Sequence, residues 1–403
     1  MNRNILIVIG ITILFLGNCI TPSVAIYNVK KQSMPINSGN TLYVGGYGEG
    51  NYTKIQDAIN DAYDGDTVFV YDDSSPYYEN VVVNKSIALI GEGQTSSVID
   101  GGGNGDVVFI SADNVHLDGF IVQHSGTFDY GVKVVAANGA FISKNIVTET
   151  YKGISIRNSN NSTIERNTVS QNQDGSTFLS SCKNTIVSGN LIQSSGVGIM
   201  LMQSTYTNIS QNIIEDNVYG IDFSSSNNTT IYQNIIRSNR GIGIQISGAN
   251  NSVIGNLIES NKLIGIEVTG WTQSMIARNN VIEDNPNGIY CWGVHSNNFI
   301  ITSNTFSNNL RGVRISYSSP ITISRNNFIK NEQDVYFRLK LFEKNLFKEN
   351  YWDNHHGIGP KVIRGKVLLF SIEFPVLYMI LEFCIPWLNF DWHPAKEPYD
   401  IGV

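Results

Sequence analysis

The chain has 403 residues, a formal net charge of −7 at pH 7 and only 15% charged residues. In place of charge it carries 48 Asn, 52 Ile and 37 Gly. A coiled coil or helix bundle is built from Ala, Leu, Glu and Lys instead, and a disordered chain lacks this much Ile. The acidic balance also argues against the basic surface that nucleic-acid binding requires, so we expect no nucleic-acid partner.

The first 25 residues have the pattern of a secretory signal peptide. Arg3 is their only charge, and an apolar run over residues 5–16 is followed by small residues. This run is too short to favour a membrane span. We therefore predict residues 1–25 as a signal peptide, residues 26–52 as a linker with the first strand, and an exported protein that is extracellular, on the cell surface or periplasmic. An alternative is a lipoprotein site at Cys19.

An internal repeat dominates the middle of the chain. Asn recurs at positions 145, 167, 190, 212, 234, 256, 279, 304 and 326, and Gly recurs at positions 131, 153, 175, 198, 220, 243, 265, 288 and 312. Each repeat holds three short β-branched segments, which indicate three strands. No stretch between them is long enough for a crossover helix, so each strand must pair with its copy in the next repeat.

The repeat predicts an all-β fold, a right-handed parallel β-helix of about 10–12 coils with about 22–24 residues each, over residues 53–338. We expect Ile to stack inside and Asn to occupy the bends, because Asn tolerates left-handed backbone and its side chains can bond one another along the axis. Gly is expected where φ must be positive. Ile55, Ala58, Ile59 and Ala62 share one helical face, which predicts a helix that caps the first coil.

The period fails after Lys330, and residues 339–403 are predicted as an irregular C-terminal cap. Residues 367–388 form an apolar segment long enough to span a bilayer, yet it contains two Glu and two Pro. We expect a cap or an extended hairpin here. The alternative is contact with a membrane or the cell envelope.

Several motifs resemble a known group of proteins. These are Gln-Asp-Ala-Ile at 56–59, Asp-Gly-Asp-Thr-Val at 64–68, Tyr-Glu-Asn-Val at 78–81, Lys-Ser-Ile-Ala-Leu-Ile-Gly at 85–91 and Asn-Tyr-Trp-Asp at 350–353. Together with the repeat they resemble right-handed β-helix proteins of the NosD type, which share a fold with pectate lyases. The resemblance covers roughly residues 41–354. It implies a carbohydrate-binding or sugar-hydrolysing domain that is often exported, and NosD itself is associated with copper-site maturation.

The outward positions of the strand after each Gly are the candidate binding residues. The predicted outward column is Lys133, Ser155, Thr177, Met200, Asp222, Gln245, Glu267, Tyr290, Arg314 and Tyr336, and Trp271 and Trp292 flank it. Carboxylates and amides bond sugar hydroxyls, and aromatic rings stack on sugar faces. We predict that Asp222, Gln245, Glu267, Trp271, Tyr290, Trp292, Arg314 and Tyr336 bind a polysaccharide or surface glycan without catalysis. The alternative is a solvent-exposed face with incidental aromatics.

The same face offers weak candidates for catalysis, namely Asp222, Glu267 and Arg314. The two carboxylates lie two coils apart, about 9.6 Å at about 4.8 Å per coil, close to the upper limit for an inverting glycosidase pair. Nothing in the sequence marks a raised pKa. The alternative function is therefore a polysaccharide lyase or hydrolase. A column of Glu215, Arg237, Glu259 and Glu283 is expected to be a stabilising charge ladder.

Metal binding is a further alternative. No cofactor is predicted, and the alternative is Ca²⁺ or a transition metal. The weak metal candidates lie near the C-terminus, where imidazole and carboxylate ligands for Zn²⁺ or Cu²⁺ gather in the sequence: His355, His356, His393, Asp353 and Asp391. Such a site would fit a NosD-like accessory protein that handles metal. His116, His124 and His295 are scattered and are expected in turns or on the surface.

Overall fold

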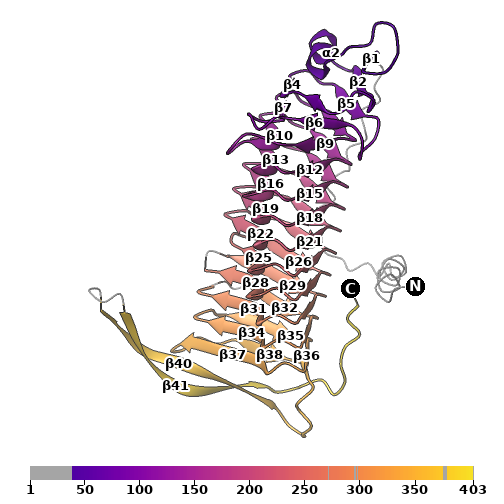
Figure 1. Cartoon of the computed structure of the whole chain (residues 1–403). Coiled ribbons are helices and arrows are strands. Elements are labelled where there is room, and N and C mark those ends of the chain that lie inside the picture. Colours follow the sequence, from indigo (N-terminus) through magenta and orange to yellow (C-terminus); the bar gives the residue numbers. More distant parts are fainter. Residues whose placement is uncertain (1–38, 271, 295, 297, 375–378, 403) are drawn as a thin grey trace.

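The computed structural model describes residues 39–402 except 271, 295, 297 and 375–378. Over this part the chain winds as a parallel solenoid with three strands in each coil (Figure 1). The predicted fold class is confirmed. One of its sheets has 13 strands, which gives 13 coils rather than the predicted 10–12. The sequence understated the number because the first coils lack the Asn and Gly marks of the repeat. The predicted signal peptide lies outside the described residues.

Three strand columns, here named faces 1, 2 and 3, run along the solenoid. Each strand pairs in register with its copy in the next coil, as β19 pairs with β22 and β22 with β25. The strands of face 1 are β4 Val81–Val83, β7 Val108–Ile110, β10 Tyr130–Val135, β13 Lys152–Arg157, β16 Gly175–Ser180, β19 Val197–Met202, β22 Tyr219–Ser224, β25 Ile242–Ile246, β28 Ile264–Thr269, β31 Asn287–Trp292, β34 Arg311–Ser316 and β37 Gln333–Lys340.

Face 2 begins with the first strand of the described chain. Its strands are β1 Thr41–Val44, β2 Thr67–Val70, β5 Ala88–Gly91, β8 His116–Asp118, β11 Phe141–Ser143, β14 Thr163–Glu165, β17 Ile186–Ser188, β20 Asn208–Ser210, β23 Thr230–Tyr232, β26 Asn251–Ile254, β29 Ser274–Arg278, β32 Asn298–Thr302, β35 Ile321–Ser324 and β38 Leu346–Lys348. Face 3 is the separate 13-stranded sheet. Its strands are β3 Tyr77–Tyr78, β6 Val98–Asp100, β9 Ile121–Gln123, β12 Ile146–Thr148, β15 Thr168–Ser170, β18 Leu191–Gln193, β21 Ile213–Glu215, β24 Ile235–Arg237, β27 Leu257–Glu259, β30 Val281–Glu283, β33 Thr305–Ser307, β36 Asn327–Ile329 and β39 Tyr351–Trp352.

Aliphatic columns fill the interior of the solenoid. Ile199, Ile221, Ile244, Ile266 and Ile289 are in register on successive strands of face 1, and each is fully buried. Burial of one such side chain contributes roughly 1.5–3 kcal/mol relative to exposure. On face 3 the inward column changes from Ile282 to aromatic rings near the C-terminal end.

The aromatic column lies inside face 3. Phe306 stacks on Phe328 with ring centroids 5.0 Å apart, and Phe328 stacks on Trp352 at 4.4 Å. Trp352 belongs to the Asn-Tyr-Trp motif, so this motif ends the buried column. The tryptophan ring is itself buried.

A buried ladder of asparagine side chains runs along the bend between faces 2 and 3. Asn212 Nδ2 donates to Asn234 Oδ1 at 2.9 Å, and Asn234 Nδ2 donates to Asn256 Oδ1 at 3.0 Å. Each Nδ2 also donates to a backbone carbonyl, as Asn234 does to Ile209 O at 2.9 Å. The ladder members are Asn145, Asn167, Asn190, Asn212, Asn234, Asn256, Asn280, Asn304, Asn326 and Asn350. The predicted bonding between Asn side chains along the axis is confirmed.

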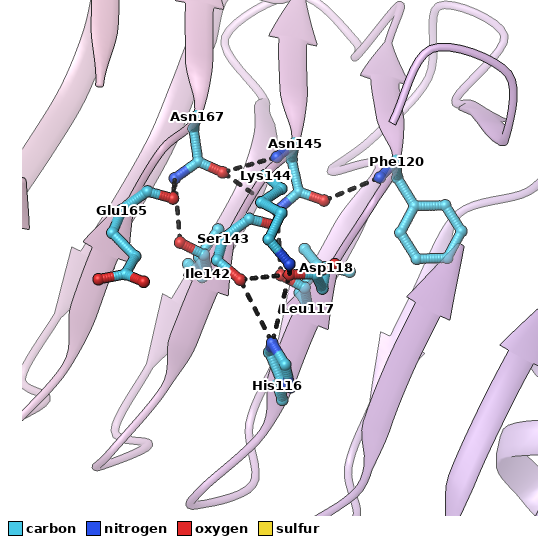
Figure 2. A network of polar contacts seen from close by, with 10 residues as sticks. All are labelled: His116, Leu117, Asp118, Phe120, Ile142, Ser143, Lys144, Asn145, Glu165 and Asn167. Carbon is cyan, nitrogen blue, oxygen red and sulfur yellow. Dashed lines mark hydrogen bonds and ion pairs between the residues drawn. The ribbon is translucent and has the colours of Figure 1, made fainter. Parts of the chain in front are cut away.

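The ladder has a direction and two different ends. At its start the backbone N–H of Phe120 donates to Asn145 Oδ1 at 3.0 Å, as Figure 2 shows. At its finish Asn350 Nδ2 donates to Asp391 Oδ2 at 3.0 Å. Between the side chains of the ladder, the donor is always the asparagine of the earlier coil, so a carboxylate, which only accepts, can terminate the series.

A second ladder, which the sequence did not reveal, runs beside face 1. Asn217 Nδ2 donates to Asn239 Oδ1 at 3.3 Å, and the series continues through Asn261, Asn285, Asn309 and Asn331. Its last member, Asn331, donates to Asp334 Oδ1 at 3.4 Å. Both ladders therefore end on an aspartate.

Three details of the predicted repeat are wrong. Asn280 rather than Asn279 belongs to the ladder, because Asn279 takes the preceding bend position with φ 53°. The residues with positive φ precede the ladder, as Gln233 does with φ 52°, so the ladder asparagines are selected for their amide bonds and not for left-handed backbone. The recurring Gly is also not a positive-φ position. At Gly220 a Cβ atom would lie 2.4 Å from Gly243 O of the next coil, so close backbone approach excludes a side chain.

The predicted helix is α2, Ile55–Asp61, and it lies at the N-terminal end of the solenoid against β1, β2 and β4 (Figure 1). Ile55, Ala58, Ile59 and Ala62 are all buried. Glu79 accepts hydrogen bonds from the N–H groups of Ile55 at 2.8 Å and of its neighbour at 2.9 Å. A carboxylate at this position satisfies exposed donors and complements the helix dipole.

The chain ends in a long antiparallel hairpin of β40, Lys361–Phe374, and β41, Met379–Asp391. Residues 365–368 of β40 extend face 1 by pairing with β37, and the part of the hairpin toward its tip projects from the solenoid (Figure 1). The apolar segment 367–388 therefore forms most of a hairpin, with 375–378 outside the described residues. Among the described residues, no helix has the length and apolar character needed to cross a bilayer.

We predict that Asn234→Ala lowers the free energy of unfolding by about 3 kcal/mol, because buried donors and acceptors on both sides lose their partners. Denaturant unfolding followed by circular dichroism measures the change. The matched control is Asn84→Ala, which alters an exposed asparagine and should change stability by less than about 0.5 kcal/mol. Equal losses in both variants would contradict a stabilising role for the ladder.

Candidate functional site

The outward column of face 1 is continuous over the middle and C-terminal coils. Register pairs join Met200 to Asp222, Asp222 to Gln245, Gln245 to Glu267, Glu267 to Tyr290, Tyr290 to Arg314 and Arg314 to Tyr336. All seven side chains are partly exposed, whereas their neighbours on either side in each strand are buried. The structure thus brings six of the eight predicted binding residues into one line along the solenoid axis.

The structure describes one of the two predicted tryptophans. Trp292 lies two residues beyond Tyr290 on β31, in register with Thr269 and Ser316, and is 54% exposed. Its ring is the large exposed aromatic surface beside the column. Trp271 lies outside the described residues.

The column differs from the sequence prediction in one N-terminal coil. Phe178, and not Thr177, is in register between Ser155 and Met200, and Thr177 points into the core. The spacing was misread because Gly175 was taken as the repeat glycine, whereas Ser176 is the residue in register with Gly153. A phenyl ring therefore joins the outward column.

The two carboxyl groups in the middle of the column are electrostatically unusual. Partial burial raises the pKa of Asp222. Burial also raises the pKa of Glu267, and the negative charge of Asp222 raises it further. The sequence offered no sign of this, because the burial of an outward side chain depends on its neighbours in adjacent coils. A carboxyl group with a raised pKa can act as a proton donor nearer to neutral pH.

The C-terminal end of the column is basic and aromatic. The Arg314 guanidinium lies 4.6 Å from the centroid of the Tyr290 ring, and that of Arg338 lies 5.3 Å from the Tyr317 ring. Glu382 of the hairpin forms an ion pair with Arg338 and accepts a hydrogen bond from the Tyr317 hydroxyl at 2.8 Å. The hairpin is therefore fixed to the solenoid at this end of the candidate site.

The predicted charge ladder on face 3 has the contacts of a structural feature. Arg237 Nε lies 2.7 Å from Glu215 Oε2, and its Nη1 lies 3.8 Å from Glu259 Oε1. All three are in register on adjacent coils. Arg237 offsets one of the two negative charges that it contacts, and these ion pairs between adjacent coils are those of a stabilising ladder.

A polar network on face 2 joins residues that the sequence left separate (Figure 2). Ser143 Oγ donates to Asp118 Oδ2 at 2.5 Å, and His116 Nε2 lies 3.3 Å from Ser143 Oγ. Burial opposes ionisation of Asp118, but bonds from His116, Ser143 and Lys144 outweigh it and lower the pKa of this carboxyl. The serine proton is directed at the carboxylate rather than at the imidazole, which is not the arrangement of an activated nucleophile. His116 is buried and not a surface residue as predicted.

The motifs that carry the family resemblance have structural roles in the first coils. Glu79 caps α2, as described above. Gln56 Oε1 accepts from Val82 N at 2.8 Å, and Asp66 Oδ1 accepts from Asn40 N at 2.7 Å. Lys85 Nζ donates to carbonyl groups at the end of α2. These motifs therefore indicate fold and carry no evidence of activity.

Comparison with known proteins agrees with this architecture. Residues 59–242 match the family model described as "Periplasmic copper-binding protein (NosD)", and residues 220–366 match "Right handed beta helix region". No curated protein matches the chain.

Among solved structures, the A-module of Azotobacter vinelandii mannuronan C-5 epimerase AlgE4 gives a TM-score of 0.61 at 16% identity, covering 70% of this chain and 92% of the module. The A-module of epimerase AlgE6 from the same organism gives 0.55 at 16% identity, covering 73% and 87%. DFA-IIIase from Arthrobacter chlorophenolicus A6 gives 0.47 at 14% identity, covering 67% and 94%. At these identities the likeness shows the fold alone.

The register, the buried ladders and these matches define the chain as a right-handed parallel β-helix protein. Within this class its N-terminal part, residues 59–242, is similar to the NosD family model. The periplasmic family is consistent with the predicted export.

The metal candidates do not form a site in the described part of the chain. No group of three or more His, Cys, Asp or Glu side chains there is placed to hold a metal ion. His355 Nε2 contacts Gly359 O at 3.1 Å, and Asp391 is committed to Asn350 and Trp352. The remaining candidates, His356, His393 and Asp353, lie beyond residue 242, where the NosD match ends. The described residues therefore do not fit the copper site that the NosD name implies.

The raised carboxyl pKa values give a stability prediction. A carboxyl group whose pKa is higher in the folded state binds its proton more tightly there, so stability falls as pH rises through the range between the unfolded and folded pKa. Above that range the ionised carboxylate is destabilising. We therefore expect Glu267→Gln to raise the free energy of unfolding at about pH 8, with the gain vanishing below the unfolded-state pKa of about 4.3. Denaturant unfolding at several pH values measures this.

Glu332→Gln is the charge-matched control, since Glu332 is exposed and directly precedes β37 of the same face. It should change stability little at any pH. A Glu267→Gln variant that is less stable than wild type at about pH 8 would contradict the assigned desolvation.

Proposed function

We propose that the chain is an exported β-helix protein that binds a polysaccharide or surface glycan along face 1, without catalysis. The observation that carries the proposal is the register of the outward column, which aligns Asp222, Gln245, Glu267, Tyr290 and Arg314 on five consecutive coils. Successive coils lie about 4.8 Å apart. A linear polymer laid along the axis would meet a new polar or aromatic side chain at each step.

The chemistry of these side chains supports a carbohydrate ligand. The carboxyl and amide groups can accept and donate bonds to sugar hydroxyls, and the exposed ring of Trp292 offers a flat apolar surface for a sugar face. The solved structures with TM-scores of 0.61 and 0.55 are mannuronan epimerase modules, which act on a polysaccharide. That activity belongs to those proteins, and it lends the same substrate class to the proposal here.

We expect the purified protein to bind polysaccharides or surface glycans on a glycan array. Trp292→Ala should weaken binding about five- to tenfold, because a stacking ring contributes on the order of 1 kcal/mol beyond its buried area. Trp392→Ala is the control, since Trp392 is 64% exposed but lies after the hairpin, outside the proposed face. Absence of binding to every glycan, or equal effects of the two substitutions, would overturn the proposal.

Catalysis on the same face is a second candidate, favoured by the raised pKa values of Asp222 and Glu267. In an inverting hydrolase one protonated carboxyl donates to the leaving oxygen while the other, ionised, removes a proton from the attacking water. Glu267 would be the acid, since both burial and the charge of Asp222 raise its pKa.

For this second candidate we expect new reducing ends from a polysaccharide panel, with the rate falling at least about 100-fold in Glu267→Gln. A lyase would instead release unsaturated ends, detected by ultraviolet absorbance. Product formation that is unchanged in Glu267→Gln, or no product from any polysaccharide, would reject catalysis by this pair and leave glycan binding as the function to be tested.

A further inference from the structure

The N-terminal part of face 1 carries a group of cations and rings that the proposed site does not use. We call it the basic aromatic cluster, and its members lie on three adjacent strands, β10, β13 and β16. They are Tyr130, Lys133, Lys152, Arg157 and Phe178. The sequence missed this cluster because Phe178 was assigned to the wrong position and Arg157 lies two residues beyond the outward column.

Two rings hold all three cations. The Arg157 guanidinium lies 5.2 Å from the Tyr130 ring centroid and 5.0 Å from that of Phe178. The Lys152 amine lies 5.6 and 5.5 Å from the same two centroids, and the Lys133 amine lies 5.0 Å from Tyr130. Cations at these distances are attracted by the faces of the rings. The positive groups are therefore gathered in one place rather than dispersed in solvent.

The carboxylates near the cluster do not neutralise it. Lys133 pairs with Asp106 at 2.8 Å, and Lys152 pairs with Asp174 at 3.1 Å. Arg157 donates to the Tyr130 hydroxyl, and no described carboxylate pairs with its guanidinium. Three cations and two paired carboxylates leave one positive charge, which resides on Arg157. Its planar guanidinium can donate two parallel hydrogen bonds to an oxyanion.

A second observation concerns a buried hydroxyl in the same part of face 1. Ser155 lies in the outward column between Lys133 and Phe178, is fully shielded from solvent, and its hydroxyl has no hydrogen-bond partner. Buried polar groups in native proteins are nearly always paired. The lysine side chains beside Ser155 are about a quarter exposed, so a ligand oxygen could displace them to reach this hydroxyl.

We propose that the basic aromatic cluster binds an anionic group of a polysaccharide, a carboxylate or a sulfate ester, and that face 1 therefore selects acidic glycans. This inference rests on the proposed function, since it names the ligand class of the same face. Phe178 is in register with Met200 and Met200 with Asp222, so the cluster lies on the same line as the carboxyl pair. At about 4.8 Å per coil, Ser155 lies about 14 Å from Asp222 along the axis, within the reach of a short oligosaccharide.

The test compares three oligosaccharides of equal length: an oligogalacturonate, a sulfated galactan and a neutral galactan. Calorimetry of the full chain should give at least about tenfold tighter binding to one of the acidic ligands than to the neutral one. The acidic ligand that binds identifies the anionic group as carboxylate or sulfate. Arg157→Gln should weaken acidic binding at least about tenfold and alter neutral binding less than about twofold. Added salt should reduce the acidic preference.

Arg166→Gln is the matched control, because Arg166 is an exposed arginine beyond β14 and its loss changes the net charge equally. It should bind as wild type. If Arg157→Gln does not fold, Lys152→Gln tests the same cluster through a partly exposed side chain. Equal affinity for acidic and neutral ligands, or acidic binding that survives these substitutions, would overturn the inference while glycan binding stands. No binding to any glycan would overturn both.

Discussion

A buried carboxamide must satisfy one oxygen and two N–H groups, and in this solenoid it does so with the coil above and the coil below. Asn234 illustrates the constraint, since it accepts from Asn212 and donates to Asn256 and to Ile209 O. All polar groups of one side chain are paired only if the asparagines of the two adjacent coils occupy the equivalent position in the same bend. The ladders therefore hold successive coils in register while the aliphatic columns supply most of the burial.

The direction of the ladders explains how the solenoid ends. The bonds between their side chains all run from the earlier coil to the later one, and a further asparagine would require a further coil. Asp391 and Asp334 end the two series because a carboxylate accepts without having to donate. Asp391 is the last residue of β41, so the first ladder is closed by the hairpin. The C-terminal hairpin thus completes the hydrogen bonding of the first ladder, and part of the hairpin also projects from the solenoid.

The outward positions carry none of these constraints, and this is where function can reside. Between two inward aliphatic residues of a face 1 strand, any side chain fits. In the middle coils these positions hold carboxyl groups with raised pKa, and toward either end they hold cations over aromatic rings. The result is a line of acidic, basic and aromatic side chains on a rigid support. Strand pairing sets the distance from one side chain to the next.

The sequence predicted the coil period, the inward Ile, the helix α2 and most of the outward column, since each follows from a local pattern repeated many times. The prediction was wrong where two adjacent residues both fitted the same position of the repeat. Asn279 and Asn280 are adjacent, and only the stacking contact selects Asn280. Gly175 and Ser176 are adjacent, and only the strand pairing puts Ser176 beside Gly153 and turns Phe178 outward.

By itself the sequence determined that this chain is a parallel β-helix with a column of polar and aromatic side chains on its outside. It could do so because the buried residues recur in the sequence with the period of the coil. The tertiary structure alone decided which groups share an electrostatic environment. The raised pKa of Glu267, the enclosure of Arg157 between two rings and the closure of a ladder by Asp391 all depend on residues 21 or more positions away. Desolvation and charge interactions act over a few ångströms in space, and sequence separation does not measure that distance.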